Sequence, residues 1–427
     1  VRRAKEAIEE RKLERSLHVG LYEGPDIPFE DKSFDIIVGL QCVYYNLDQS
    51  RFASECSRVL KDNGVIFFSF FSPRHGYMKY ISGKPGGIVE FTKEHPNPQL
   101  AGLKSFLFSG RRQFEQIYGG FFNINIGLEE YDLLEVFQSW FFLRGQKISA
   151  VPKKKITFAR FSPGKLIRDN SNKKAIDLTS ALRNNIGAKE KNLERQPAYF
   201  DSLRYPNEQI IRFIARRKSR AEGNHLVFHI GKEVSVTMAS ESNALEIDFQ
   251  SLANIMMLKD HGHNAFGVSV NKNLIFRIRE ELKQQGLPKN VNIDFWDGCS
   301  LPFSRDYFDI VISKEAAYCQ PGQKLFIKEC FRITKPNGEV FFFYLSPRHG
   351  YVKYAKSIGN DLYQFSTEHP EPRLRNMIVF LPDKKTLESL WSPFFEVKVG
   401  MWEYDFDSVF SSFFVVYGKK VLDKEKS

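Results

Sequence analysis

The segment FEDKSFDIIV, residues 29–38, recurs as FSRDYFDIVI at residues 303–312, an offset of 274 residues. The same offset relates several further segments without a gap, and from residue 130 onward it becomes 273. The matched segments are Asn-Gly at 63–64 and 337–338, Ser-Pro-Arg-His-Gly-Tyr at 72–77 and 346–351, Glu-His-Pro at 94–96 and 368–370, and Glu-Tyr-Asp at 130–132 and 403–405. A repeat of this length predicts two homologous domains, which we call copy one and copy two.

Composition limits the classes of protein that the chain can belong to. With 427 residues, 42% hydrophobic and 14% aromatic, the chain can bury sizeable cores, which excludes wholesale disorder. Its longest apolar runs, residues 65–71 and 340–345, are strand-sized and fall short of the roughly 18 to 20 residues of a membrane span. The five cysteines are scattered and form no Cys-x-x-Cys pair. We therefore expect a reducing cytoplasm, no disulfide framework and no metal site.

Apolar periodicity predicts alternating strands and helices in both copies. Short β-branched runs are typical of buried parallel strands, and helical patterns that end at Asn-Gly lead into the next strand. The expected strands are 34–39, 65–71, 308–312 and 340–345, the expected helices 48–60 and 323–333, and the expected antiparallel pairs 121–126 with 137–143 and 394–399 with 409–417. The pattern indicates α/β domains with a mostly parallel sheet and an antiparallel edge strand.

This order of features resembles the class I S-adenosylmethionine-dependent methyltransferases, close to the small-molecule, methyltransferase type 11-like kind. That family reads acidic residue, L-P-F, F-D-x-[IV]-[IV], then a helix ending in R-V-L-K-x-x-G. The matching residues are Asp297, Leu301-Pro302-Phe303 and Phe308-Asp309-Ile310-Val311 in copy two, and Glu23, Ile27-Pro28-Phe29, Phe34-Asp35-Ile36-Ile37 and the segment 58–64 in copy one. The resemblance implies two tandem Rossmann-like methyltransferase domains, S-adenosylmethionine as cofactor and a small-molecule acceptor.

In copy two the resemblance places the cofactor at the carboxyl ends of the first strands. The family's first-strand motif is an acid followed by three alternating glycines, and here Glu246 supplies the acid. Asp248, Gln250 and Leu252 stand at the glycine positions, where a Cβ would be strained at any left-handed residue. Ser269 stands where the family has an acid for the ribose. The remaining cofactor candidates are Asn254, Asp297 and Gly298. These departures favour a cofactor pocket that has decayed or been remodelled.

Copy one offers fewer cofactor candidates, namely Glu23 and Gly24, the counterparts of Asp297 and Gly298. The repeat offset places Val1 opposite Ile275, inside the helix that follows the second strand of copy two. We therefore expect about 70 further residues upstream in the natural protein, bearing copy one's first strands and an intact glycine motif. Reading the full coding sequence tests this expectation.

The repeated Ser-Pro-Arg-His-Gly-Tyr segment supplies the catalytic candidates. His75 or His349 could act as a general base near neutral pH, with Arg74 or Arg348 holding an anionic group of the substrate. The alternative is a hydrogen-bonded network that pins a long loop to the sheet. Repetition of the segment in a copy with a doubtful cofactor motif favours the second interpretation.

The net charge of +11 is concentrated between the copies, because residues 147–200 hold thirteen basic and four acidic residues. We divide the chain into copy one (1–146), a basic linker (147–204), copy two (205–421) and a polar tail (422–427). A solvated linker is favoured over a nucleic-acid contact. The leading function is a methyltransferase in which copy one is catalytic. The alternative is a non-catalytic scaffold that binds a ligand or partner.

Overall fold

The computed structural model describes residues 24, 26–132, 136–148, 209–211, 213–214, 242–285, 290–405 and 409–421. The chain divides into two compact units, one built mainly on copy one and the other on copy two. No helix in the described ranges is long and apolar enough to cross a membrane. Most of the predicted basic linker, the polar tail and Glu23 lie outside these ranges, so the domain boundaries stay predictions.

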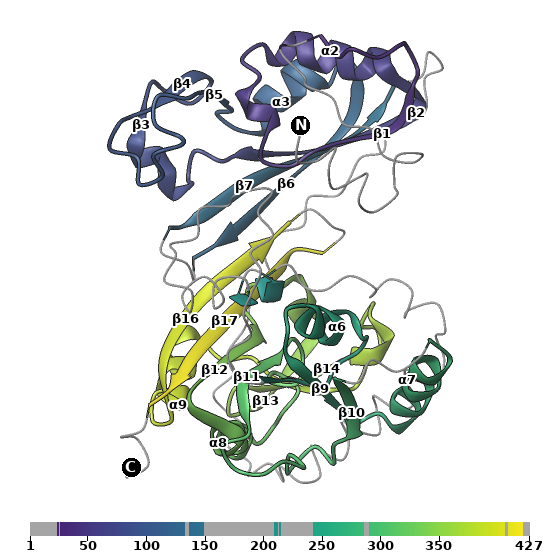
Figure 1. The fold of residues 1–427 in the computed structure, drawn as a ribbon, viewed down its shortest axis with the longest axis vertical. Helices are drawn as coiled ribbons and strands as arrows, with labels where there is room; N and C mark the ends of the chain where they lie inside the picture. The colour runs from purple at the N-terminus through teal and green to yellow at the C-terminus, as the bar shows by residue number, and fades with distance from the viewer. Residues whose placement is uncertain are drawn as a thin grey trace. The chain divides into compact units, whose positions relative to one another are not determined.

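Copy one is a four-stranded mixed sheet in the order β1-β2-β7-β6. Only β1 and β2 are parallel, whereas β7 runs antiparallel to both of its neighbours. Helices α2 and α3 contact each other and the sheet strands (Figure 1). The elements are β1 (Phe34–Gly39), α2 (Gln49–Val59), β2 (Leu60–Phe71), β3 (Ile81–Ser82), β4 (Gly87–Phe91), β5 (Lys104–Leu107), α3 (Arg111–Tyr118), β6 (Phe122–Tyr131) and β7 (Gln138–Lys147), with short 3-10 turns at Val43–Tyr45 and Gly76–Tyr80.

Copy two repeats this plan and adds three parallel strands, giving the order β16-β17-β12-β11-β8-β9-β10 (Figure 1). The elements are β8 (Asn243–Ile247), α6 (Ala253–Asp260), β9 (Asn264–Ser269), α7 (Lys272–Gln285), β10 (Val291–Phe295), β11 (Phe308–Ser313), α8 (Gln323–Ile333), β12 (Thr334–Leu345), β13 (Ala355–Gly359), β14 (Leu362–Phe365), β15 (Ile378–Phe380), α9 (Lys384–Trp391), β16 (Phe395–Tyr404) and β17 (Ser411–Lys420), with short 3-10 turns at Gly350–Tyr354 and Pro372–Leu374. The predicted α/β class with a mostly parallel sheet and antiparallel edge is confirmed for copy two.

The predicted elements are found with small differences at their ends. Strands β2 and β12 begin five or six residues earlier than predicted, because the Asn-Gly turn lies within an irregular stretch of the strand and does not precede it. Asn63 and Asn337 adopt left-handed φ values of 68° and 65° there, which asparagine tolerates better than most residues. Strand β7 also takes in Lys147, the first residue of the predicted linker.

The two copies differ most at the strand that follows the L-P-F-like segment. In copy two, β11 pairs with β12 on one side and β8 on the other, and Ile310 and Ile312 are fully buried. In copy one, the only strand that pairs with β1 in the described ranges is β2. The counterparts Ile36 and Val38 are 62% and 60% exposed. Among the described residues, β1 of copy one is therefore paired on one edge, whereas β11 of copy two is paired on both.

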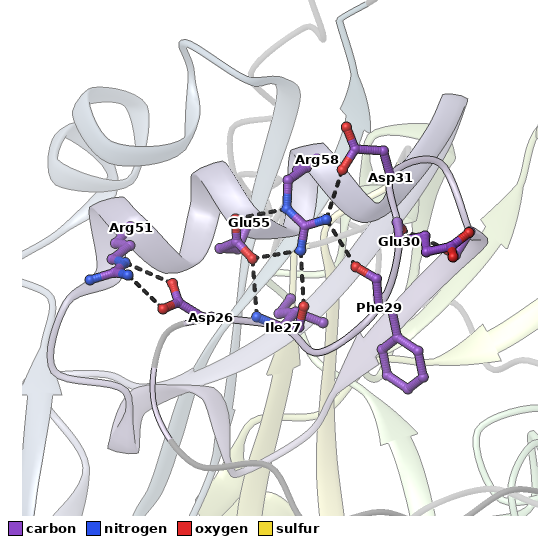
Figure 2. A network of polar contacts seen from close by, with 9 residues as sticks. Asp26, Ile27, Phe29, Glu30, Asp31, Arg51, Glu55 and Arg58 are labelled. Carbon is purple, nitrogen blue, oxygen red and sulfur yellow. Dashed lines mark hydrogen bonds and ion pairs between the residues drawn. The ribbon is translucent and has the colours of Figure 1, made fainter.

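The family-like motifs are joined by one arginine in each copy. Arg58, in α2, donates to the carbonyl oxygens of Ile27 and Phe29, both at 2.9 Å, and pairs with Glu55 at 2.8 Å (Figure 2). Glu55 also accepts from the backbone N–H of Ile27. In copy two, Arg332 and Glu329 make the same set of bonds to Leu301 and Phe303. In each copy, an arginine near the end of the helix α2 or α8 therefore holds the loop that precedes β1 or β11.

A matched pair of helix starts gives a first testable prediction. Asp48 caps α2 by accepting the N–H of Arg51 at 3.0 Å, whereas its counterpart Gly322 leaves α8 without a side-chain cap. A Cβ at Gly322 would meet no atom within 4 Å. We expect Gly322→Asp to raise the free energy of unfolding of copy two by a few tenths of a kcal/mol, because glycine is itself a tolerated cap, and Asp48→Ala to lower that of copy one by about 1 kcal/mol. Urea unfolding measures both changes, and a destabilised Gly322→Asp variant would contradict the prediction.

Candidate functional site

The cofactor candidates of copy two meet at the carboxyl ends of β8 and β9, which are adjacent parallel strands. Asp248 directly follows β8 in a left-handed conformation with φ 57°. Its backbone N–H donates to Val268 O at 2.7 Å, and its carboxylate accepts from the Ser269 hydroxyl at 3.2 Å. Both side chains are buried. One glycine position of the motif is thus left-handed and is occupied by a residue that carries a Cβ.

Glu246 lies on β8, two residues before Asp248, and is 4% exposed. Its Oε1 accepts from Asn254 Nδ2 of α6 at 2.7 Å, while its Oε2 has no hydrogen-bond partner. Burial raises the pKa of this carboxyl group to about 7, against the smaller lowering effects of Asn254 and of the Lys314 charge. The predicted candidates Glu246 and Asn254 are therefore brought together, and their contact is internal to the copy.

A charged cluster that the sequence analysis missed lies at the end of β11. The buried Glu315 forms an ion pair with Arg373 of the 3-10 turn Pro372–Leu374, and Arg373 Nε lies 3.3 Å from Glu371 Oε1. Burial lowers the pKa of the Lys314 ammonium group, and the charges of Glu315, Arg373 and Glu371 also act on it. The available signal was the comparison of the copies, because the repeat offset places Gln41 and Gln99 of copy one at the positions of Glu315 and Arg373.

Asp297 and Gly298 form a turn after β10. The Asp297 carboxylate accepts from the backbone N–H groups of Cys299 and Ser300 at 2.8 and 2.9 Å, and Gly298 is left-handed with φ 84°. In copy one, Gly24 has φ 101° and open space within 4 Å of a built Cβ. Its neighbour Glu23 lies outside the described residues. Asp297 is exposed, so its carboxylate remains accessible to a ligand at this turn.

His75 and His349 occupy equivalent buried positions at the start of a 3-10 turn. Each accepts the backbone N–H of the tyrosine two residues later on Nδ1, at 3.1 Å. His75 Nε2 lies 3.2 Å from Gln138 Oε1. Burial lowers the pKa of His75 to about 4 and that of His349 to about 3. Both rings are neutral at pH 7, and this geometry resembles the loop-pinning network more closely than an exposed general base.

Arg74 is largely exposed, and its Nη1 pairs with Glu130 Oε2 at 2.8 Å. Glu130 also accepts from the hydroxyl of the buried Ser139. The guanidinium group of Arg74 lies 5.9 Å from the centre of the Phe137 ring, and that of Arg348 lies 5.8 Å from the Phe410 ring. These contacts join the Ser-Pro-Arg-His-Gly-Tyr segment to the Glu-Tyr-Asp segment and the last strand. A role in binding an anionic substrate stays a prediction.

The repeated Glu-His-Pro histidines lie in aromatic surroundings. His95 is ringed by Tyr77, Tyr80 and Phe91 at centroid distances of 4.4 to 5.5 Å. His369 has the same arrangement with Tyr351, Tyr354 and Phe365. In each case Nδ1 accepts a backbone N–H at 3.0 Å, and the buried Nε2 has no hydrogen-bond partner. No group of three or more acidic, histidine or cysteine side chains within the described ranges could hold a metal ion.

Comparison with known proteins identifies the repeat. The model of a family described as "Methyltransferase domain" matches residues 1–68 and 251–342. One matched segment lies in each copy of the repeat. The second matched segment begins at Ser251 and so leaves out Glu246 and Asp248.

Curated relatives match over short stretches. An uncharacterized protein of Haemophilus influenzae is 30% identical over 86 residues, which is 20% of this chain and 34% of that protein. Methyltransferase GfsG of Streptomyces halstedii is 27% identical over 79 residues, which is 18% of this chain and 28% of that protein. The chain thus spans about a third of the length of these relatives.

Among solved structures, a SAM-dependent methyltransferase of Methanosarcina mazei aligns with 18% identity and a TM-score of 0.35, over 44% of this chain and 95% of that one. Phosphoethanolamine N-methyltransferase 2 of Haemonchus contortus, solved with S-adenosyl-L-methionine, aligns with 13% identity and a TM-score of 0.32, over 86% of this chain and 71% of that one.

The residues at the edge of copy two do not fit S-adenosylmethionine in the way the family motif would hold it. A glycine there lets the backbone approach the ligand, whereas Asp248 brings a Cβ and a carboxylate into the turn. The ribose position holds Ser269, whose hydroxyl is directed to Asp248. Asp297 is the one exposed acid at this edge among the predicted cofactor residues.

Proposed function

We propose that the protein is an S-adenosylmethionine-dependent methyltransferase that acts on a small-molecule acceptor, with copy one as the catalytic half. The observation that carries the proposal is the match of the methyltransferase domain in both copies, across the segments joined by Arg58 and Arg332. The buried Glu315–Arg373 ion pair of copy two has no counterpart at the described positions of copy one. Gly24 is a left-handed glycine in open space, and Gln41 and Gln99 are uncharged.

We place the reaction in the cytoplasm, since all five cysteines are free and no pair forms a disulfide. His75 and His349 serve in this proposal to position the loops after β2 and β12, through the bonds they make to Tyr77 and Tyr351. A contact with nucleic acid is not favoured, because the excess of basic residues lies in the predicted linker and not in the methyltransferase copies.

Calorimetric titration with S-adenosylmethionine and with S-adenosylhomocysteine tests the proposal. We expect saturable binding of both molecules by the protein, with a dissociation constant in the micromolar range usual for substrates and cofactors of enzymes, about 1 μM to 1 mM. Transfer of a radiolabelled methyl group to members of a small-molecule library then identifies the acceptor. Absence of any heat of binding with both molecules would defeat the catalytic proposal and leave the scaffold alternative.

A further inference from the structure

We propose that the carboxyl edge of copy two is closed by its own side chains and holds no S-adenosylmethionine, so that the cofactor binds outside copy two. This inference rests on the proposed function and sharpens it, because it assigns different tasks to two copies of one domain. It depends on three sets of contacts at the carboxyl ends of β8, β9 and β11, the first of which lies at the glycine and ribose positions of the family motif.

The first set fixes the turn after β8. The backbone N–H of Asp248 is bonded to Val268 O on the neighbouring strand, so the turn is tied to β9. The Asp248 carboxylate then accepts from Ser269 Oγ, and these two side chains are 3% and 0% exposed. The glycine position and the ribose position of the motif are therefore bonded to each other. A ligand would have to break a buried hydrogen bond and displace a Cβ to enter.

The second set turns the motif acid inward. Asn254 Nδ2 of α6 donates to Glu246 Oε1 at 2.7 Å. The positive charge of Lys314, in the same copy, also acts on this carboxyl group. One oxygen of this buried acid, Oε1, is therefore already bonded within the copy, while Oε2 has no hydrogen-bond partner. The repeat offset places Leu40 of copy one at the position of Lys314, so this cation is specific to copy two.

The third set joins the 3-10 turn Pro372–Leu374, between β14 and β15, to the end of β11. Arg373 and Glu315 form an ion pair with side chains that are 14% and 7% exposed, and Glu371 adds a second carboxylate to the same guanidinium group. Breaking a buried ion pair costs several kcal/mol, because it leaves an uncompensated charge. Gln41 and Gln99 cannot form such a pair in copy one. This ion pair is therefore specific to copy two among the described residues.

The sequence match agrees with this division. The methyltransferase-domain model resumes at Ser251 in copy two, after the strand and turn that carry Glu246 and Asp248. Helix α6 and strand β9 lie within the matched segment. The match therefore leaves out Glu246 and Asp248 and takes in Ser269 and Asp297.

Direct ultraviolet crosslinking with radiolabelled S-adenosylmethionine, followed by peptide mapping, tests the inference in the whole chain. We expect label in peptides of copy two, residues 242–421, to stay at background. The double variant Asp248→Gly/Ser269→Asp restores one motif glycine and the motif acid, and we expect it to raise that label at least tenfold. Asp361→Gly is the matched control, because Asp361 is also a left-handed aspartate, φ 56°, but lies in the turn between β13 and β14.

A second variant, Glu315→Gln/Arg373→Gln, gives copy two the residues of copy one at the ion pair, and should raise the label further when added to the first pair. Label in copy two of the wild-type protein, removed by excess S-adenosylhomocysteine, would overturn the inference and leave the proposed function intact. A folded four-residue variant that stays at background would also overturn it. If no part of the wild-type protein is labelled but the variants gain label in copy two, the proposed function fails and the closure stands.

Discussion

His75 in copy one and His349 in copy two are each expected to lower the free energy of unfolding of their copy by about 2 kcal/mol between pH 7 and pH 5, and the buried His369 of copy two, whose pKa burial lowers to about 4, adds to that loss. Burial lowers the pKa of the His75 and His349 rings to about 4 and about 3, below the ordinary value of about 6.5. Between these values, the unfolded chain binds a proton that the folded chain does not. Stability is therefore fully present above pH 6.5 and is lost as pH falls toward the folded pKa.

Urea unfolding at pH 7 and pH 5 measures this effect, and His349→Asn isolates it. Asparagine does not titrate, and its side-chain oxygen can accept the Tyr351 N–H that His349 Nδ1 accepts at present. We expect the variant to lose about 2 kcal/mol less than the wild type between the two pH values. His261→Asn, at a half-buried histidine outside the repeated segments, serves as the control. An unchanged pH dependence in His349→Asn would contradict the assignment.

Much of the fold could be predicted because the same pattern of apolar residues occurs in both copies of the repeat. The strands 34–39 and 308–312, the helix 323–333 and the closing strand pairs follow from apolar periodicity that recurs at a fixed offset. The different environment of Ile36 and Ile310 could not be predicted from those segments, since both read as buried strands. What buries Ile310 is strand β8, more than sixty residues away in the sequence.

The candidate site was predictable in its location and only partly in its contacts. The position of Asp248 next to Ser269 follows from the adjacent parallel strands β8 and β9, whereas the left-handed φ of Asp248 was not predicted. The Glu315–Arg373 pair did not follow, because it joins residues 58 apart across a loop that carries no periodic signal. A buried ion pair depends on the path of such a loop, which local sequence does not fix.

Tyr344→Phe is expected to lower the free energy of unfolding of copy two by about 2–4 kcal/mol, since two buried polar groups lose their partner. In the wild-type protein, Trp391 Nε1 donates to Tyr344 Oη at 3.2 Å, and Tyr344 Oη donates to Gln323 Oε1 at 3.0 Å. Gln323 in turn donates to two carbonyl oxygens before α8. All three side chains are buried, so water cannot replace the lost bonds.

In copy one, the equivalent buried glutamine is reached by one hydrogen bond, whereas in copy two two hydrogen bonds link Trp391 to Gln323 through Tyr344. Phe70 stands at the position of Tyr344, Tyr118 stands at that of Trp391, and Tyr118 Oη donates directly to Gln49 Oε1 at 2.7 Å. We therefore expect Trp391→Tyr added to Tyr344→Phe to recover about 1–2 kcal/mol through the copy-one bond, after the cost of the smaller ring. A double-mutant cycle by urea unfolding measures the coupling. Copy two differs from copy one at both of these positions. If the losses in free energy of unfolding from Tyr344→Phe and Trp391→Tyr simply add in the double variant, the new tyrosine does not bond to Gln323 Oε1, and the prediction is wrong.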